Sequence, residues 1–351
     1  MIQRRTLLKS TAAAAALGAP GLSALAQQAV TLKFHTFMAP LSNVWLNMHK
    51  PWMEKVEKDS GGRIKFEAYP AMQLGGSPPQ LYDQVKDGVV DIAWTVAGYS
   101  AGRFPRVEVF ELPFMMSNAE ATSKAYWEFI QTMAPDEYKD VHTIALHVHG
   151  PGVIHTADKP IKSVADMRGQ KMRAPTRQIT KLMGILGATP VGMPLPSIPD
   201  ALSKGTINGC VIPWEVVPSV KVQELTKYHA EFDPAGGALY TTAFVMPMNK
   251  AKYESLAPDL KKVIDKNSGM AVSGWLGKIQ QAGDIEGRKS AETRGNQIYT
   301  IGAEQAQEFR RKARPLDADW VEDMNKRGYD GRKLLDGARS LIEKHTKTTK
   351  T

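Results

Sequence analysis

Cysteine is nearly absent from this chain of 351 residues, because Cys210 is the only one. A single cysteine cannot form an internal disulfide, so the stability of the folded chain must come from its hydrophobic cores. Cys210 stands in an apolar stretch, where a buried and unreactive thiol is expected rather than a nucleophile. The sequence therefore excludes a disulfide-stapled scaffold.

Signatures of catalysis and metal binding are missing as well. The sequence has no GxSxG, P-loop, HExxH or GxGxxG pattern. His147 and His149 would share one face of a regular strand, but no acid accompanies them as a further ligand. We therefore expect no metal and no cofactor, and a binding protein rather than an enzyme.

The charge balance lacks the pattern of a nucleic-acid-binding protein. Lys and Arg total 45 against 36 Asp and Glu, a formal net charge of +9, but the basic residues are scattered. No basic stripe carries interleaved aromatic residues, so we expect no nucleic acid as a partner. A mildly positive surface can still attract small anions by long-range steering.

The first 26 residues have the order of an export signal. Arg4 and Arg5 precede an Ala-rich apolar run, and Ala24-Leu25-Ala26 offers a cleavage site, so the mature chain should begin near Gln27. The paired arginines fit twin-arginine export and general secretion equally. No later segment is apolar enough to span a bilayer. The expected location is the periplasm.

The rest of the chain alternates strands and helices in two similar α/β units, which predicts two lobes with a cleft between them. The expected elements of the first unit are a strand at Val30–His35, a helix at Asn43–Asp59 and a strand at Val89–Trp94. Those of the second unit are a strand at Lys171–Ala174, a helix at Thr176–Leu186 and a strand at Ile207–Ile212.

One very long helix is expected from Pro258 to about Arg294, as a strut along both lobes. The predicted division gives residues 27–151 and about 239–276 to lobe I, and about 152–238 and 277–325 to lobe II. A C-terminal helix and tail take 326–351.

The segment around Arg173 is the strongest candidate for a binding site. A strand carries Arg173 towards its carboxyl end, Pro175 ends the strand, and a helix starts at Thr176. A guanidinium, a hydroxyl and free helix amides would thus meet, and each favours an anion. The alternative is that Arg173 forms a salt bridge with an acid of its own lobe.

Other candidates stand at the ends of expected strands or at the passage between the units. Trp214 follows a strand of the second unit, and Phe37, Trp94 and Tyr99 occupy comparable positions in the first. Each of these aromatic residues could also belong to the core. His149 lies where the first unit passes into the second.

Several motifs resemble the DctP-type substrate-binding proteins of TRAP transporters, in order and spacing, over essentially the whole mature chain. They are Leu74-Gly75-Gly76, Gly88-Val89-Val90-Asp91, Phe110-Glu111-Leu112-Pro113-Phe114, Lys171-Met172-Arg173-Ala174-Pro175 and Ile207-Asn208-Gly209. The resemblance implies an α/β, two-lobed periplasmic binding protein (a flytrap) with a long helix spanning both lobes. It also implies a membrane permease partner with a large and a small subunit.

The same resemblance implies residue roles. Arg173 corresponds to the carboxylate clamp, and Thr176 and Arg177 fall where family members contact the ligand from the helix start. Members that bind sialic acid have a second arginine, an asparagine and an aromatic residue where this chain has Gly152, Ile212 and Leu195. These departures point away from a polyhydroxy sugar acid and towards a small organic monocarboxylate, of the aromatic or 2-oxo type.

Two other functions fit the same architecture. One is a two-lobed enzyme acting on a small carboxylic acid, with His149 as the base, which a turnover assay would detect. The other is a ligand-sensing module whose partner is a receptor instead of a permease.

Overall fold

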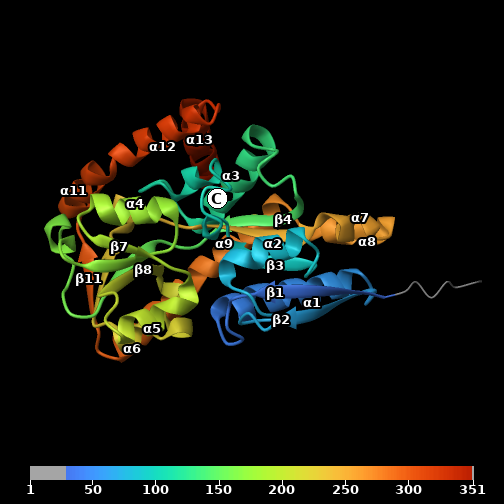
Figure 1. Cartoon of the computed structure of the whole chain (residues 1–351), viewed down its shortest axis with the longest axis horizontal. Coiled ribbons are helices and arrows are strands. Elements are labelled where there is room, and N and C mark those ends of the chain that lie inside the picture. The colour runs from blue at the N-terminus through green and yellow to red at the C-terminus, as the bar shows by residue number, and fades with distance from the viewer. Residues whose placement is uncertain (1–28, 350–351) are drawn as a thin grey trace, which may run out of the picture.

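The computed structural model describes residues 29–349, which form two mixed β-sheets with helices packed against them (Figure 1). The export signal predicted for residues 1–26 lies outside the described residues. Within residues 29–349, no helix combines the length and the apolar character needed to cross a membrane.

The first sheet has five strands in the order β2-β1-β3-β10-β4. Strand β1 pairs in parallel with β2 and β3, whereas β10 runs antiparallel to both β3 and β4. Its strands are β1 (Val30–Thr36), β2 (Ile64–Tyr69), β3 (Ile92–Val96), β4 (Val141–Val148) and β10 (Ala243–Asn249).

The second sheet has six strands in the order β11-β9-β5-β8-β6-β7. Strand β6 is parallel to β7 and β8, and β5 is antiparallel to its neighbours β8 and β9. Its strands are β5 (Gly152–Thr156), β6 (Lys171–Ala174), β7 (Thr189–Gly192), β8 (Gly209–Pro213), β9 (Tyr228–Phe232) and β11 (Gln297–Ile301).

The chain passes between the sheets after β4, after β9 and once more along the helices that follow β10. Each sheet therefore contains strands from two separate parts of the chain, which confirms the predicted two-lobed α/β fold. We propose that these passages bound the lobes at the residue numbers given above.

Helices cover the first sheet and form its connections. They are α1 (Lys50–Asp59), α2 (Leu81–Lys86), α3 (Ala119–Met133), α7 (Lys250–Ser255), α8 (Pro258–Lys266) and α9 (Met270–Ala282). The Asn118 side chain caps α3 by accepting a hydrogen bond of 2.8 Å from the Ala121 amide, which satisfies one of the free donors of its first turn.

The second sheet has its own helices, and the last helix of the chain returns to pack on α3. They are α4 (Arg177–Ile185), α5 (Ile198–Ser203), α6 (Val222–Leu225), α10 (Asp284–Thr293), α11 (Ala303–Ala313), α12 (Pro315–Lys326) and α13 (Gly331–Thr349). In Figure 1, α11, α12 and α13 follow one another across the top of both lobes.

Short helical turns occupy many of the connections. They are η1 (Trp45–His49), η2 (Pro78–Gln80), η3 (Ala97–Tyr99), η4 (Val107–Glu111), η5 (Val164–Met167), η6 (Leu195–Ser197), η7 (Trp214–Val216), η8 (Pro218–Val220) and η9 (Pro234–Gly236).

The predicted strut of one helix from Pro258 to Arg294 is wrong in its first third. Helix α8 ends before Gly269, whose φ of 95° is not helical, and α9 begins at Met270. Beyond that break, α9 and α10 follow each other directly, because Gly283 between them keeps right-handed helical angles. Helix α9 packs on α3 and β4, and α10 packs on η7, so the pair spans both lobes.

Two other expected elements differ in detail. The helix expected at Asn43–Asp59 starts at Asn43 as predicted, but its turn η1 is π-helical, next to Pro51, which has no amide hydrogen for a regular α-helical ladder. The strand expected at Val89–Trp94 starts only at Ile92.

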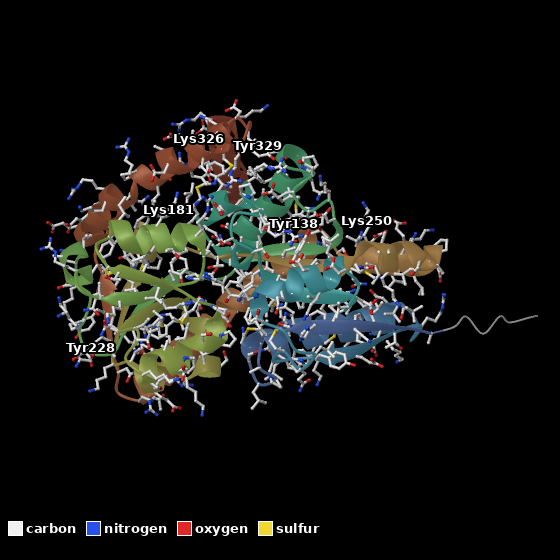
Figure 2. The ribbon with its side chains drawn as sticks, viewed as in Figure 1. Tyr138, Lys181, Tyr228, Lys250, Lys326 and Tyr329 are labelled. Atoms are coloured by element: carbon white, nitrogen blue, oxygen red, sulfur yellow. The ribbon has the colours of Figure 1, made fainter. Side chains whose placement is uncertain are left out.

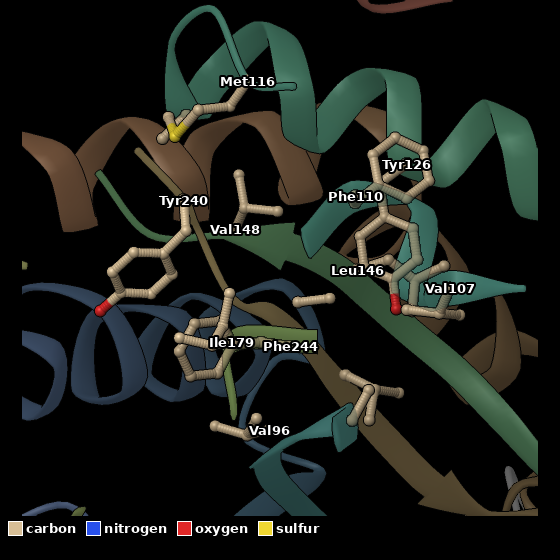
Figure 3. Packing of buried hydrophobic residues seen from close by; sticks show 14 of the residues in the cluster. Val96, Val107, Phe110, Met116, Tyr126, Leu146, Val148, Ile179, Tyr240 and Phe244 are labelled. Carbon is tan, nitrogen blue, oxygen red and sulfur yellow. The ribbon is translucent and has the colours of Figure 1, made fainter. Parts of the chain in front are cut away.

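Buried side chains of both lobes form a continuous hydrophobic core. Figure 3 shows part of it, where Phe110, Tyr126 and Leu146 gather on one side and Tyr240 and Phe244 on the other. The lysines labelled in Figure 2 lie on the outside and come from three separate helices.

Candidate functional site

A cavity with an empty volume of about 380 Å³ lies between the two sheets and is lined by residues of both lobes. Seven of the ten residues singled out in the sequence line it: Phe37, Trp94, Tyr99, His149, Arg173, Leu195 and Ile212. The other lining residues are Met38, Val96, Pro175, Val211, Pro213, Glu215, Val216, Tyr240, Thr242, Phe244 and Gln280. Most of these side chains are apolar or aromatic, so the cavity suits a small molecule with an apolar body.

Arg173 is the cationic side chain of this lining. It lies in β6 opposite Cys210 of β8, and only 2% of its surface is exposed. Its Nε donates to the Met193 carbonyl over 2.9 Å, and its Nη1 donates to the Val211 carbonyl over 3.1 Å. Both bonds go to backbone oxygens, and they fix the plane of the guanidinium.

The expected alternative, a salt bridge within the lobe, is wrong for the described residues, since none of their acids lies within ion-pair distance of Arg173. Because Nε is occupied, a carboxylate can be held in a fork only by Nη1 and Nη2. A desolvated guanidinium without a counter-ion strongly favours an anionic ligand.

Tyr99 of η3 closes the cavity from the opposite lobe. Its hydroxyl oxygen accepts a hydrogen bond of 2.9 Å from the Leu195 amide of η6, a contact that crosses from the first lobe to the second. Burial raises the pKa of Tyr99. The hydroxyl therefore stays protonated and keeps its own hydrogen for a further acceptor.

His149 is a neutral member of the lining. Its Nδ1 lies 2.5 Å from the Gly150 carbonyl oxygen, which assigns the ring hydrogen to Nδ1 and leaves Nε2 as an acceptor. Burial lowers the pKa of His149 to about 4, with a smaller contribution in the same direction from the nearby Arg173 charge. At neutral pH this imidazole therefore adds no positive charge.

Aromatic rings form a flat wall of the cavity. Trp94 and Phe244 stack with ring centroids 4.5 Å apart, and Phe37 lies 5.3 Å from Trp94. The Trp94 indole donates to His147 Nε2 over 2.7 Å, which fixes the orientation of the ring. Such a wall complements a planar apolar ligand.

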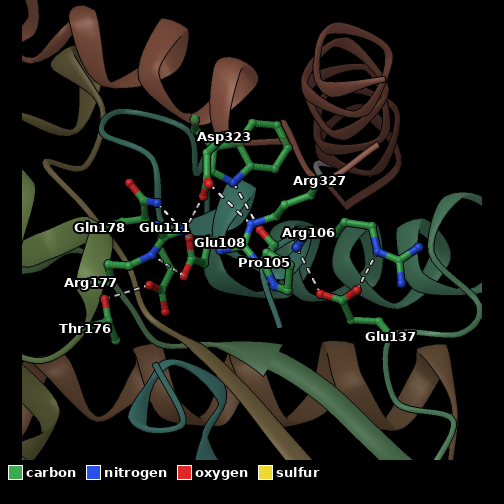
Figure 4. Close-up of polar contacts among 11 residues, drawn as sticks. Pro105, Arg106, Glu108, Glu111, Glu137, Thr176, Arg177, Gln178, Asp323 and Arg327 are labelled. Carbon is green, nitrogen blue, oxygen red and sulfur yellow. Dashed lines mark hydrogen bonds and ion pairs between the residues drawn. The ribbon is translucent and has the colours of Figure 1, made fainter. Parts of the chain in front are cut away.

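Three of the predicted residues are not brought to the cavity. The Thr176 hydroxyl donates to Glu111 over 2.6 Å, and Arg177 pairs with Glu108 and with Asp323, at 2.7 Å for the latter (Figure 4). The start of α4 therefore binds acids of the opposite lobe and of α12. These acids lie 65 or more positions away in the sequence.

Trp214 also points away from the cavity. Its indole donates to Glu231 over 3.0 Å, and its ring meets the His155 ring with centroids 5.1 Å apart. Its neighbour Glu215 lines the cavity instead.

Glu215 and Gln280 form a polar corner that sequence reasoning missed. The Gln280 side-chain amide donates to Glu215 over 2.8 Å, and the Glu215 backbone amide donates to Asp284 over 2.9 Å. Burial raises the pKa of Glu215 to about 7. No local pattern marks Gln280, because it faces the cavity only through the position of α9 across both lobes.

The lobes meet in a second set of contacts above the cavity, which we term the α4 latch: Glu108 and Glu111 of η4 with Thr176, Arg177 and Gln178 (Figure 4). Burial raises the pKa of Glu111 to about 8, and the nearby Glu108 charge raises it further. The hydrogen bond from Thr176 and the Arg177 charge lower it. A Cβ atom at Gly98 would lie only 2.5 Å from Thr176 Cγ2, so the lobes are in direct contact here.

The family model of the bacterial extracellular solute-binding proteins, family 7 (DctP), matches residues 34–323. A TRAP solute-binding protein from Rhodoferax ferrireducens T118, solved with copurified benzoate, is 70% identical with a TM-score of 0.91 and covers 91% of this chain and 99% of its own. A marine metagenome TRAP solute-binding protein specific for aromatic acid ligands was solved with 3-hydroxybenzoate. It is 51% identical with a TM-score of 0.89, and the match covers 91% of this chain and 99% of its own. A Bordetella bronchiseptica relative with bound mandelate is 25% identical with a TM-score of 0.81, and the match covers 90% of this chain and 99% of its own.

Proposed function

The chain belongs to family 7 of the bacterial extracellular solute-binding proteins, the DctP-type receptors of TRAP transporters, and on this basis we propose that it captures benzoate-like aromatic monocarboxylates. One observation carries the proposal. Arg173 is a buried cation without a counter-ion among the described residues, and it faces a largely apolar cavity with one aromatic wall.

The two parts of such a ligand match two parts of the cavity. The carboxylate would take the free hydrogens of Arg173 Nη1 and Nη2 as acceptors. The ring would lie against the wall formed by Trp94 and Phe244. The benzoate and 3-hydroxybenzoate found in the two similar structures have this combination of a carboxylate and a flat ring. An aliphatic 2-oxo acid would leave the aromatic wall largely unused.

The remaining steps of the proposed role follow from the family. The protein would work in the periplasm, with the mature chain starting near Gln27, and would deliver its ligand to a membrane permease with a large and a small subunit. The α4 latch and the Tyr99–Leu195 contact both join the lobes, which supports closure about the ligand as the form that the permease meets.

Benzoate is expected to stabilise the ligand-free protein. The protein would first be unfolded, dialysed and refolded, which removes any copurified ligand. At a ligand concentration of about 100 times the dissociation constant, the free energy of unfolding should rise by ~2.7 kcal/mol, which a thermal-shift assay detects as a rise of several degrees in Tm. Benzamide, which has the ring but no charge, and galactonate, which has the charge but no ring, are the matched probes and should shift Tm little.

The same preparation separates a receptor from an enzyme. Benzoate recovered by denaturing extraction after overnight incubation should be chemically unchanged and equimolar with the protein. A benzoate-independent Tm would argue against the proposed ligand class, and a transformed product would favour the two-lobed enzyme.

Benzoate affinity is expected to weaken as the pH rises from 6 to 9. In the closed form, burial raises the pKa of Glu111 from 4.5 to about 8. The protonated carboxyl therefore stabilises the closed form fully below pH 4.5, and this stabilisation is lost as the pH rises through about 8. Benzoate itself stays ionised over this range, since carboxylic acids have a pKa of about 4.

Calorimetric titration of wild type and Glu111→Gln at both pH values tests this. The ratio of the dissociation constants at pH 9 and pH 6 should be smaller in the variant, because Gln has no proton to lose. Part of the dependence should persist, because burial also raises the pKa of Glu215 to about 7. If this ratio is the same in Glu111→Gln as in wild type, protonation of Glu111 does not affect lobe closure.

A further inference from the structure

Tyr240 stands in the cavity with its hydroxyl unused. It lies in the passage from β9 to β10, is 1% exposed and lines the same cavity as Arg173. Its Oη atom is buried and has no hydrogen-bond partner among the described residues. A buried hydroxyl without a partner destabilises the protein that contains it, unless a ligand or a water supplies the partner.

The ring of Tyr240 is held firmly in this position. Its backbone carbonyl accepts a hydrogen bond of 3.0 Å from the Gly152 amide, and its ring meets the His149 ring edge-on with centroids 5.5 Å apart. A Cβ atom at Gly152 would lie 2.0 Å from Tyr240 Cε1. The ring can therefore occupy this space only because residue 152 has no side chain.

The hydroxyl lies in the electrostatic field of Arg173. Burial raises the pKa of Tyr240 well above its usual value, and the Arg173 charge is the first influence that opposes this rise. The Tyr240 ring fills the space that a side chain at position 152 would take, so the hydroxyl is a neutral donor in the lining that holds the Arg173 charge.

We propose that the Tyr240 hydroxyl donates a hydrogen bond to the ligand carboxylate beside Arg173, so that one cation and one neutral donor hold the anion together. This inference rests on the proposed function and adds a selectivity. With His149 neutral, Arg173 is the cation in the lining, and Glu215 and Gln280 present oxygen atoms elsewhere in the cavity. A second carboxylate on the ligand would find no cation to pair with it, so phthalate and other dicarboxylates should be rejected.

Tyr240→Phe tests the hydroxyl alone, because phenylalanine keeps the ring that fills the space above Gly152. Titration with benzoate should show an affinity roughly ten- to hundredfold lower than that of wild type. The Tm of the ligand-free variant should be equal to or higher than that of wild type, because an unpartnered buried hydroxyl has been removed. A purely structural tyrosine would instead give a lower Tm with affinity intact.

Tyr82→Phe is the matched control. Tyr82 is also 1% exposed with an unpartnered hydroxyl, but it packs against Phe104 in the first lobe and does not line the cavity. Its removal should leave benzoate affinity unchanged. An equal loss of affinity in both variants would show that the effect is not specific to the cavity and would overturn the inference.

The outcomes separate this inference from the proposed function. If wild type does not bind benzoate, the proposed function fails. If wild type binds benzoate, Arg173→Ala does not, and Tyr240→Phe binds as tightly as wild type, the inference fails alone. If Tyr240→Phe does not fold, the affinities of wild type for benzoate and phthalate, measured by competition, test the predicted selectivity. Equal affinities would overturn the inference.

Discussion

Arg173→Ala should lower the affinity for benzoate by roughly 30- to 3,000-fold, which corresponds to the ~2–5 kcal/mol lost when one partner of a buried charged pair is removed. The guanidinium is 2% exposed, and the carboxylate would remain desolvated in an aromatic cavity without its cation. Calorimetric titration of the refolded, ligand-free variant measures the loss directly.

Arg173→Lys separates charge from geometry. Lysine keeps the charge, but it cannot reproduce the planar group whose Nε and Nη1 are fixed by the Met193 and Val211 carbonyls, so it should also bind poorly. Arg103→Ala is the control, because Arg103 pairs with Asp83 at 2.7 Å on the first lobe and does not line the cavity. Wild-type affinity in Arg173→Ala, with the control unaffected, would show that the ligand binds elsewhere.

Gly287→Ala should destabilise the protein by about 1–3 kcal/mol, the usual cost of adding volume to a packed contact. A Cβ atom at this position of α10 would lie 1.9 Å from the Trp214 carbonyl oxygen and 3.1 Å from the Glu215 amide nitrogen. Both are backbone atoms, so they cannot rotate out of the way. Chemical denaturation of the ligand-free protein gives the change in the free energy of unfolding.

Gly184→Ala supplies the comparison within another helix. There the added Cβ would find its nearest neighbour, Pro190 Cγ, 3.9 Å away, so the substitution should stabilise α4 by up to ~1 kcal/mol. Gly287→Ala should also weaken benzoate binding, because it displaces Glu215 from the cavity wall. Equal stability of the two variants would mean that α10 does not press on η7 in solution.

The family, the two-lobed fold and the role of a solute-binding receptor were predicted, the family and the role from the order of the motifs, and all three are confirmed. The motifs are local runs of residues, so they are visible without knowledge of the tertiary structure. Arg173 could be singled out for the same reason, since a strand end followed by Pro175 and a helix start is a local pattern.

The predicted contacts of Thr176 and Arg177 could not be read correctly from local sequence. The helix start was placed correctly, but its partners Glu108 and Glu111 come from the other lobe, far away in the sequence. Tyr240 was missed because its place beside the cavity depends on the missing side chain of Gly152, which lies 88 positions earlier in the sequence, in β5. The strut was drawn too long because Gly269 looked like the other helical glycines, yet it alone among those in 258–294 has a positive φ.

A crystal structure of the protein grown with benzoate would show where the ligand binds and which residues hold it. We expect one benzoate between the lobes, with its carboxylate oxygens about 3 Å from Arg173 and its ring along the wall of Trp94 and Phe244. A benzoate bound outside this cavity, or inside it with the carboxylate turned away from Arg173, would show that Arg173 is not the carboxylate-binding residue.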